Sequence, residues 1–187
     1  MNLRAAALQK QLVTHHAELQ AVLSSLRAEQ MQLAVYSHGS PDQWTVQALL
    51  AHIASASEGL LKIAQAVTRG ENPVPENWDV NRWNNRQVRE HANALPADLI
   101  SRIHAAHAGW LQFVESTTEL ELERMGRHPS GQTLSVKQMI QTHALHQVQH
   151  IRELASALPA HEQQEALPAP AGRRAARAAS TRAKEWA

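Results

Sequence analysis

Three histidines near the end of the chain occupy positions where a helix of a bundle normally buries apolar side chains. Residues 133–158 carry the spacing of one helical face, whose positions are Met139, His143, His146, His150, Leu154 and Leu158. Burying an imidazole without a partner costs about 1–3 kcal/mol of free energy. A metal ion would satisfy such rings, and His146 and His150 lie one helical turn apart, so both can reach one ion. The spacing therefore predicts a metal site on this helix.

Composition limits which side chains can hold the metal. The chain has 187 residues, a length that suits one stable domain with a tail, and it contains no cysteine. It therefore has no disulfide framework, no thiolate ligand and no cysteine nucleophile. Any metal must be held by histidine and carboxylate groups.

Charge and hydropathy bear on partners and location. No stretch approaches about eighteen apolar residues, and the N-terminus lacks the pattern of a signal peptide. We therefore expect a cytoplasmic protein with no membrane partner. The net charge is +1, and residues 159–187 carry five Lys and Arg against three Glu, which leaves thirteen basic and fourteen acidic residues elsewhere. Because the folded part has no basic excess, we expect a small-molecule substrate rather than nucleic acid.

Four long helices are predicted, with a long connection between the second and the third. Breakers end the first helix before Pro41 and the second at Gly70, and Pro96 begins the third. The predicted helices span 2–35, 44–69, the residues after Pro96, and 133–158, with a short helix at 80–91 inside the connection 71–95. Sustained β-branched alternation is absent from the sequence, so residues 1–158 are predicted to form an all-α four-helix bundle. Residues 159–187 have no apolar stripe and are predicted to be a disordered tail.

The depth of each histidine along its helix selects the third ligand. Since an α-helix rises about 1.5 Å per residue, His52 lies roughly 12 Å from the start of its helix, and His150 and His146 lie roughly 12–18 Å from the end of theirs. The three are level if the two helices run antiparallel, whereas parallel helices would separate them by on the order of 10 Å. An antiparallel pair needs a long crossover, which the connection 71–95 can provide. We therefore predict an up-down-down-up bundle with His52 as the third metal ligand.

Other polar residues fit the site less well. His107 lies about 15 Å along its own helix, which is level with the site. It flanks the apolar stripe of that helix and is therefore the second choice for the third ligand. His143 lies on the stripe of the other two histidines and could be a ligand, a hydrogen-bond donor to a ligand or a pocket wall. His15 falls roughly 28 Å from the shared end of the bundle. Glu58 is the nearest carboxylate on the helix of the third ligand. The remaining histidines are expected at the surface or in loops: His16, His38, His91, His104, His128 and His161.

Three segments resemble motifs of the DinB/YfiT-like metalloprotein superfamily. WTVQALLAHI at 44–53 resembles the start of the second helix of that family, where the histidine is a metal ligand. HQVQH at 146–150 resembles the closing helix, which supplies the other two ligands. DVNRWN at 79–84 looks like a segment of members close to the thiol-dependent maleylpyruvate isomerases. The resemblance covers about residues 1–158.

The resemblance implies an up-down-down-up four-helix bundle in which His52, His146 and His150 bind zinc or nickel. Several family members are thiol S-transferases or isomerases that use a low-molecular-weight thiol such as mycothiol or bacillithiol. Many others have no demonstrated activity. The family also suggests a homodimer.

Three neutral imidazoles leave coordination positions open, as in catalytic zinc sites. Such an ion can lower the pKa of bound water or of a bound thiol, and the thiol must come from a cofactor because the chain has no cysteine. We expect a divalent-metal enzyme that transfers or isomerises a small electrophile with a low-molecular-weight thiol. The alternatives are a metal-dependent hydrolase that uses metal-bound water, and a non-catalytic metal-binding stress protein. Trp83 could be a pocket wall and Asn84 a polar anchor, or Trp83 could only attach the crossover to the bundle.

Overall fold

Four long helices form the bundle: α1 (Leu3–Ser25), α2 (Val46–Thr68), α4 (Pro96–Ser116) and α6 (Val136–Ala157). The computed structural model describes residues 3–35 and 44–158. The tail predicted at 159–187, together with His38 and His161, lies outside the described residues.

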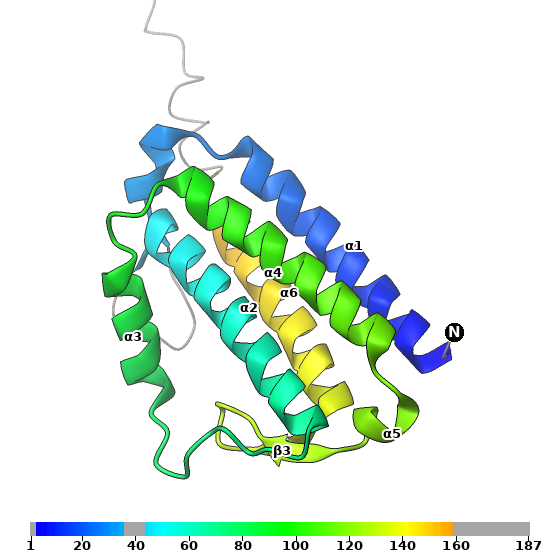
Figure 1. Ribbon diagram of the computed structural model, residues 1–187. Coiled ribbons are helices and arrows are strands. Elements are labelled where there is room, and N and C mark those ends of the chain that lie inside the picture. The colour runs from blue at the N-terminus through cyan, green and yellow to red at the C-terminus, as the bar shows by residue number, and fades with distance from the viewer. Residues whose placement is uncertain (1–2, 36–43, 159–187) are drawn as a thin grey trace, which may run out of the picture.

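The four helices run up, down, down and up (Figure 1). α1 and α6 share one direction, and α2 and α4 share the opposite one. α2 packs against α4 and α6, and α1 packs against the same two helices. The crossover between α2 and α4 carries the short helix α3 (Val80–Glu90), which lies along the outside of α2. The predicted all-α bundle, its topology and its long crossover are therefore confirmed.

Short strands replace terminal residues of three of the predicted long helices. The additional elements are η1 (Ala28–Gln32), β1 (Ala34–Val35), β2 (Trp44–Thr45), α5 (Glu119–Leu122), β3 (Met125–Arg127) and β4 (Thr133–Ser135). β1 pairs with β2, and β3 pairs with β4, both antiparallel. The prediction of one helix up to residue 35 is wrong, because the Gln30 side chain accepts a hydrogen bond from the Arg27 backbone N–H at 2.8 Å and fixes a separate turn.

Side-chain caps set the starts of α2 and α6. Thr45 accepts a hydrogen bond from the Ala48 backbone N–H, and Ser135 accepts one from that of Gln138, both at 3.2 Å. Such caps satisfy N–H groups that have no partner in the first helical turn. α6 therefore begins at Val136, because the residues predicted as its first turn belong to β4.

The interior has two apolar clusters with a polar layer between them. Leu19, Leu50 and Ile103 belong to the cluster where α2 begins. Leu12 and Trp110 belong to the cluster at the other end. His16, His107 and His150 are buried between the two clusters along their helices, whereas His52 is buried beside residues of the first cluster and His143 beside residues of the second. The bundle therefore places its polar chemistry at mid-height.

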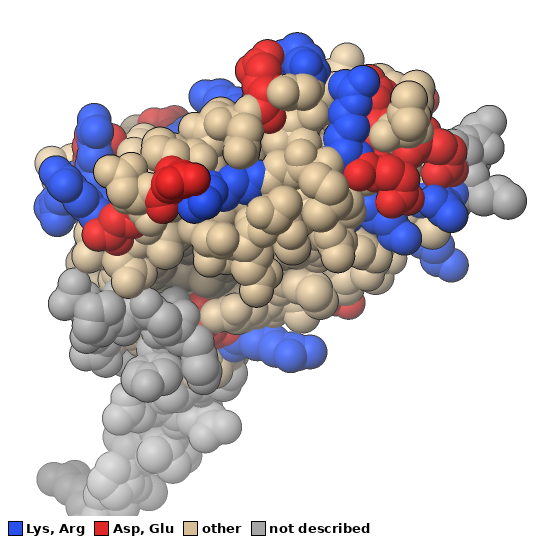
Figure 2. Space-filling model, turned by 90° about the horizontal axis from the view of Figure 1, so that it is seen from below, with Lys and Arg blue, Asp and Glu red and all other residues tan. Residues whose placement is uncertain are grey.

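Acidic and basic side chains alternate on the face seen from below the view of Figure 1. Figure 2 shows them side by side at several places around a broad uncharged area. Arg4, for example, contacts Glu119 and Glu123 at 3.4 and 2.9 Å. Within the part of the chain that the structure describes, no helix is both long and apolar enough to span a membrane.

Candidate metal centre

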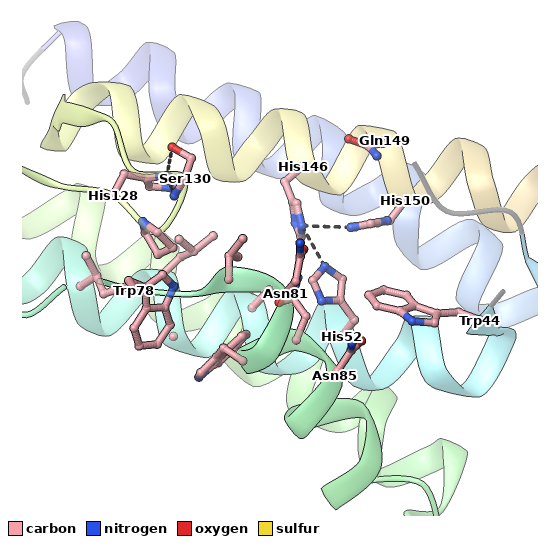
Figure 3. Close-up of a pocket in the computed structure, with 18 residues that line it drawn as sticks. Trp44, His52, Trp78, Asn81, Asn85, His128, Ser130, His146, Gln149 and His150 are labelled. Atoms are coloured by element: carbon pink, nitrogen blue, oxygen red, sulfur yellow. Dashed lines mark hydrogen bonds between the residues drawn. The ribbon is translucent and has the colours of Figure 1, made fainter. Parts of the chain in front are cut away.

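Three imidazoles from two antiparallel helices meet at mid-height in the bundle. Nε2 of His146 lies 3.1 Å from Nε2 of His52 and 3.0 Å from Nε2 of His150 (Figure 3). Tetrahedral zinc with Zn–N bonds of about 2.0–2.1 Å places its ligand nitrogens about 3.3 Å apart. Two of the three nitrogen pairs thus have nearly the spacing of ligands around one ion, and all three nitrogens lie within 4.8 Å of one another. The structure brings together the three histidines that the sequence analysis selected, and this donor set fits a divalent metal.

Two of these rings, those of His52 and His146, are held neutral by burial. Burial, followed by the charge of neighbouring His150, lowers the pKa of His52 from 6.5 to about 3. Burial also lowers the pKa of His146 well below its usual value, and the charges of His150 and His52 lower it further. Because a metal binds the unprotonated nitrogen, the neutral form is the one that can act as a ligand.

Glu153 orients the ring of His150. His150 Nδ1 donates a hydrogen bond to Oε2 of Glu153 at 2.6 Å, and Gln149 Nε2 donates one to Oε1 of the same carboxylate at 3.0 Å. The carboxylate is almost fully buried, at 6% exposure. Since the proton is on Nδ1, the lone pair of His150 is on Nε2, which faces the other two rings. Metal-binding histidines commonly have such a partner.

The sequence analysis missed Glu153 and considered Glu58 instead. Both oxygens of Glu58 accept hydrogen bonds from Arg102 at 2.8 Å, which ties the carboxylate to α4. Glu153 lies three residues after His150, which was a usable signal, because residues at this spacing share a helical face. A glutamate close to a helix end reads as a surface residue until the packing of the helix is known.

His143 and His107 lie in a second group of imidazoles. His143 stacks on Trp110, with ring centroids 4.4 Å apart. His107 stacks on His16 at 3.6 Å, and Nε2 of His16 lies 3.0 Å from Nδ1 of His104. Neither His143 nor His107 joins the three converging nitrogens or lines the cavity beside them.

His16 was expected at the surface and is instead buried at 8% exposure. The apolar pattern of the sequence assigned the inward position to His15. His16 fits that pattern equally well, because both residues lie three or four positions from Leu12 and from Leu19. His15 is half-buried, with Nδ1 at 3.7 Å from the Glu18 carboxylate. Adjacent residues point about 100° apart around a helix. The rotation of α1 about its own axis therefore decides whether His15 or His16 faces the interior.

A cavity of about 470 Å³ lies beside the three histidines. Its walls come from α2, α6, the crossover and the loop between β3 and β4; the lining includes Trp44, Trp78, Asn81, Trp83, Asn84, Asn85, His128 and Gln149. Trp83 also lies over Gly59 of α2, where a Cβ would meet the indole at 3.5 Å. Trp83 and Asn84 therefore line the cavity as predicted, and Trp83 also attaches the crossover to the bundle.

His128 was expected to be a surface or loop residue and is buried at 6% exposure. It does lie in a loop, but the β3–β4 hairpin folds this loop over the cavity. Its Nδ1 accepts a hydrogen bond from the Ser130 backbone N–H at 3.2 Å. A hairpin whose strands have three residues each is too short to be predicted from alternation, so no sequence pattern indicated the burial of His128.

The chain matches the family described as the DinB superfamily over residues 11–154. A protein of Oceanobacillus iheyensis with the name "Putative metal-dependent hydrolase" is 26% identical over 140 residues, which are 74% of this chain and 76% of that protein. The family match covers all of the site residues discussed above.

Three solved structures share the fold. YfiT from Bacillus subtilis, described as "a probable metal-dependent hydrolase with an unusual four-helix bundle topology", has a TM-score of 0.68 at 16% identity, covering 87% of this chain and 90% of its own. The mycothiol-dependent maleylpyruvate isomerase has a TM-score of 0.67 at 16% identity, covering 82% of this chain and 61% of its own. The colibactin self-resistance protein ClbS, solved in complex with a dsDNA, has a TM-score of 0.65 at 15% identity, covering 88% and 97%. These TM-scores, at identities of 15–16%, establish the shared fold and no more.

Proposed function

The chain belongs to the DinB superfamily, and on that premise we propose that it is a divalent-metal enzyme in which His52, His146 and His150 hold the ion. The observation that carries the proposal is the convergence of three imidazole nitrogens within 4.8 Å of one another beside a cavity, with Nε2 of His146 at 3.1 Å from that of His52 and 3.0 Å from that of His150. Three imidazoles cannot satisfy one another fully at this spacing, whereas one ion satisfies all of them.

Zinc and nickel are the metals proposed, because imidazole ligands suit both. When bound, the ion would act as a Lewis acid and lower the pKa of a water or thiol in its open position. The chain's own residues do the rest. Glu153 fixes the orientation of His150, and the cavity provides room for a substrate beside the centre.

We propose that the reaction is the transfer or isomerisation of a small electrophile with a low-molecular-weight thiol. The supporting observations are the absence of cysteine from the chain and the shared fold with the mycothiol-dependent maleylpyruvate isomerase. A hydrolase that uses water is the second candidate, favoured by the names of the Oceanobacillus iheyensis protein and of YfiT. Turnover of activated esters without thiol would favour the hydrolase, and turnover of an electrophile only with added thiol would favour the transferase.

Elemental analysis tests the metal directly. Protein purified without a histidine tag should contain about one divalent metal ion per chain, whereas a His146→Ala/His150→Ala variant should contain none. His15→Ala is the matched control, because it removes a half-buried histidine outside the centre and should keep the metal. If the parent stays metal-free after incubation with zinc and with nickel, the three histidines are structural and the enzyme proposal fails. Metal that binds without any exchangeable ligand or turnover would favour the non-catalytic stress protein.

We infer a small-molecule substrate rather than DNA. The cavity has the size of small-molecule sites, which are about 300–1,000 Å³. The face in Figure 2 mixes acidic and basic side chains instead of presenting a basic stripe. A mobility-shift titration with double-stranded DNA at 150 mM salt checks this, because the structural neighbour ClbS was solved with dsDNA. Binding at micromolar protein would reverse the inference.

A further inference from the structure

The walls of the cavity beside the histidines carry no formal charge. Among the described residues that line it, none is Lys, Arg, Asp or Glu. Its polar side chains are mainly amides: Asn81, Asn84 and Asn85 from the crossover, and Gln149 from α6. An anionic substrate that enters here would lose its hydration without meeting a fixed positive side chain in these walls.

Three charged groups of the neighbouring elements have partners outside the cavity. Asp79 accepts a hydrogen bond from the Arg82 backbone N–H at 2.9 Å and caps α3. Arg86 pairs with Glu90 at 2.7 Å. Arg127 donates to the backbone oxygen of Glu76 at 3.2 Å. None of the three lines the cavity.

Three residues of this wall have a buried side-chain nitrogen without a hydrogen-bond partner among the described residues: Trp78 (Nε1), His128 (Nε2) and His52 (Nδ1). His52 belongs to the three-histidine set, so the two donors independent of the metal are those of Trp78 and His128. An indole nitrogen can only donate. His128 Nδ1 accepts from the backbone N–H of Ser130 at 3.2 Å and lies 2.9 Å from Ser130 Oγ, a hydroxyl that can also donate to it, so we assign the proton of the neutral ring to Nε2. Burial lowers the pKa of His128, which favours this neutral form.

Both donors lie at the same end of the cavity. Figure 3 shows His128 and Trp78 on the side of the three metal-site histidines that faces away from Trp44. Buried donors are nearly always hydrogen-bonded in native proteins. Two unpartnered donors in one apolar-walled pocket therefore indicate an acceptor group on the molecule that fills it.

We infer that the cavity, apart from the metal centre, binds an uncharged, apolar substrate body that carries a carbonyl-type oxygen acceptor for the N–H groups of Trp78 and His128. Trp78 and Trp83 supply the aromatic wall, with ring centroids 6.3 Å apart. The placement of a reacting bond near the metal rests on the proposed function. The binding of the substrate body does not, because neither donor belongs to the three-histidine set.

Three probes of nearly equal shape test this inference: 2-acetylnaphthalene, 2-naphthoate and 2-ethylnaphthalene. Calorimetry or tryptophan fluorescence measures their binding to the full chain, as purified and after removal of metal by a chelator. The neutral ketone should bind at least about ten-fold more tightly than the carboxylate in the chelated protein. Equal or tighter binding of the carboxylate there, or no binding of any probe, would overturn the inference.

Two variants test the donors. Trp78→Phe and His128→Phe each keep a ring and remove one N–H, and each should lower the ratio of ketone affinity to hydrocarbon affinity by about five-fold. Trp83→Phe is the matched control, because its indole lines the same wall but is not a buried donor without a partner. It should weaken both probes alike and leave the ratio unchanged. An unchanged ratio in both donor variants would mean that these N–H groups are satisfied by water, and the inference would fail.

The two proposals fail separately. Loss of metal binding with intact ketone selectivity would remove the enzyme proposal and keep the substrate class. A normal metal content with no preference for the neutral ketone would do the reverse.

Discussion

The contact between His150 and Glu153 is the shortest polar contact of the centre. The distance of 2.6 Å between Nδ1 and Oε2 is short even for a hydrogen bond to a charged group, and the pair is almost fully buried. Its effect is to fix which nitrogen of His150 carries the proton and where its lone pair points. The bond therefore acts on metal affinity through the orientation of a ligand.

Replacing Glu153 should weaken metal binding without abolishing it. Glu153→Gln keeps the shape but removes the charge, and we expect zinc affinity to fall about 10- to 100-fold, as for other partners of metal ligands. Competition with a chromophoric chelator measures the affinity. Glu58→Gln is the control, since that carboxylate is held by Arg102 and should leave the affinity unchanged. Equal affinities of Glu153→Gln and the parent would show that His150 needs no such partner.

At the residue scale, the sequence predicted the converging histidines but not the residues around them. His52, His146 and His150 could be found because ligands at helical spacing on a buried stripe leave a clear pattern. His128 could not, because its burial depends on a hairpin that closes over the cavity. Whether the three rings bind a metal remains a prediction that elemental analysis must test.

At the scale of elements, depth along helices was sufficient to predict the topology. α2 and α6 had to be antiparallel for their histidines to be level, and the length of the crossover allowed it. The helix ends were less predictable, because they are decided by single hydrogen bonds such as those of Gln30 and Ser135. The exchange of His15 for His16 has the same origin, since tertiary packing sets the rotation of α1.

Close packing of the β3–β4 hairpin on α2 leaves no room for a side chain at Gly126. A Cβ at this position would collide with the side chain of Val67. Gly126→Ala should lower the free energy of unfolding by about 1–3 kcal/mol, as overpacking does in other cores. Denaturant unfolding measures the change. Adding Val67→Ala should recover part of the loss if the collision is the cause. A purely additive double variant would show that the strain lies elsewhere.

The contact between α1, α4 and α6 buries His16, His107 and His143 as neutral rings. Burial, with neighbouring histidines as the second cause, lowers the pKa of His16 and of His107 from 6.5 to about 4, and that of His143 to about 3. Between these lowered pKa values and pH 6.5, the unfolded chain therefore binds more protons than the folded chain. Stability is fully present above pH 6.5 and is lost as the pH falls toward these lowered pKa values.

Removing one of these rings should reduce the dependence of stability on pH. In His143→Leu, the unfolded and folded states differ by one bound proton fewer than in the parent. The slope of the free energy of unfolding against pH should therefore fall by up to about 1.4 kcal/mol per pH unit between pH 6.5 and 4. Urea unfolding of the metal-free protein at several pH values measures the slope. Leu145→Ala, an exposed position on the same helix, should keep the parent slope. If the slope of His143→Leu is unchanged, His143 is protonated in the folded protein as well.

At the scale of the whole molecule, a polar layer separates two apolar clusters. Such a layer is costly if its nitrogens stay unpartnered, and His143 has no hydrogen-bond partner on either nitrogen among the described residues. The three-histidine centre lies in the same layer, and it joins α2 to α6 across 94 residues of sequence. A ligand at this point would hold together elements that are distant along the chain.

Zinc should therefore stabilise the entire bundle. A ligand that binds only the folded state adds about 2.7 kcal/mol at a hundred-fold excess over its dissociation constant. For a domain of this size the melting temperature should rise by roughly 5–10 °C. Thermal unfolding with and without zinc measures the shift, and His52→Ala should show almost none. Since protons compete for the ligand nitrogens, the shift should also shrink at acidic pH. A zinc-induced shift of the same size in His52→Ala and in the parent would place the metal outside this centre, because the imidazole of α2 is needed to connect the two helices.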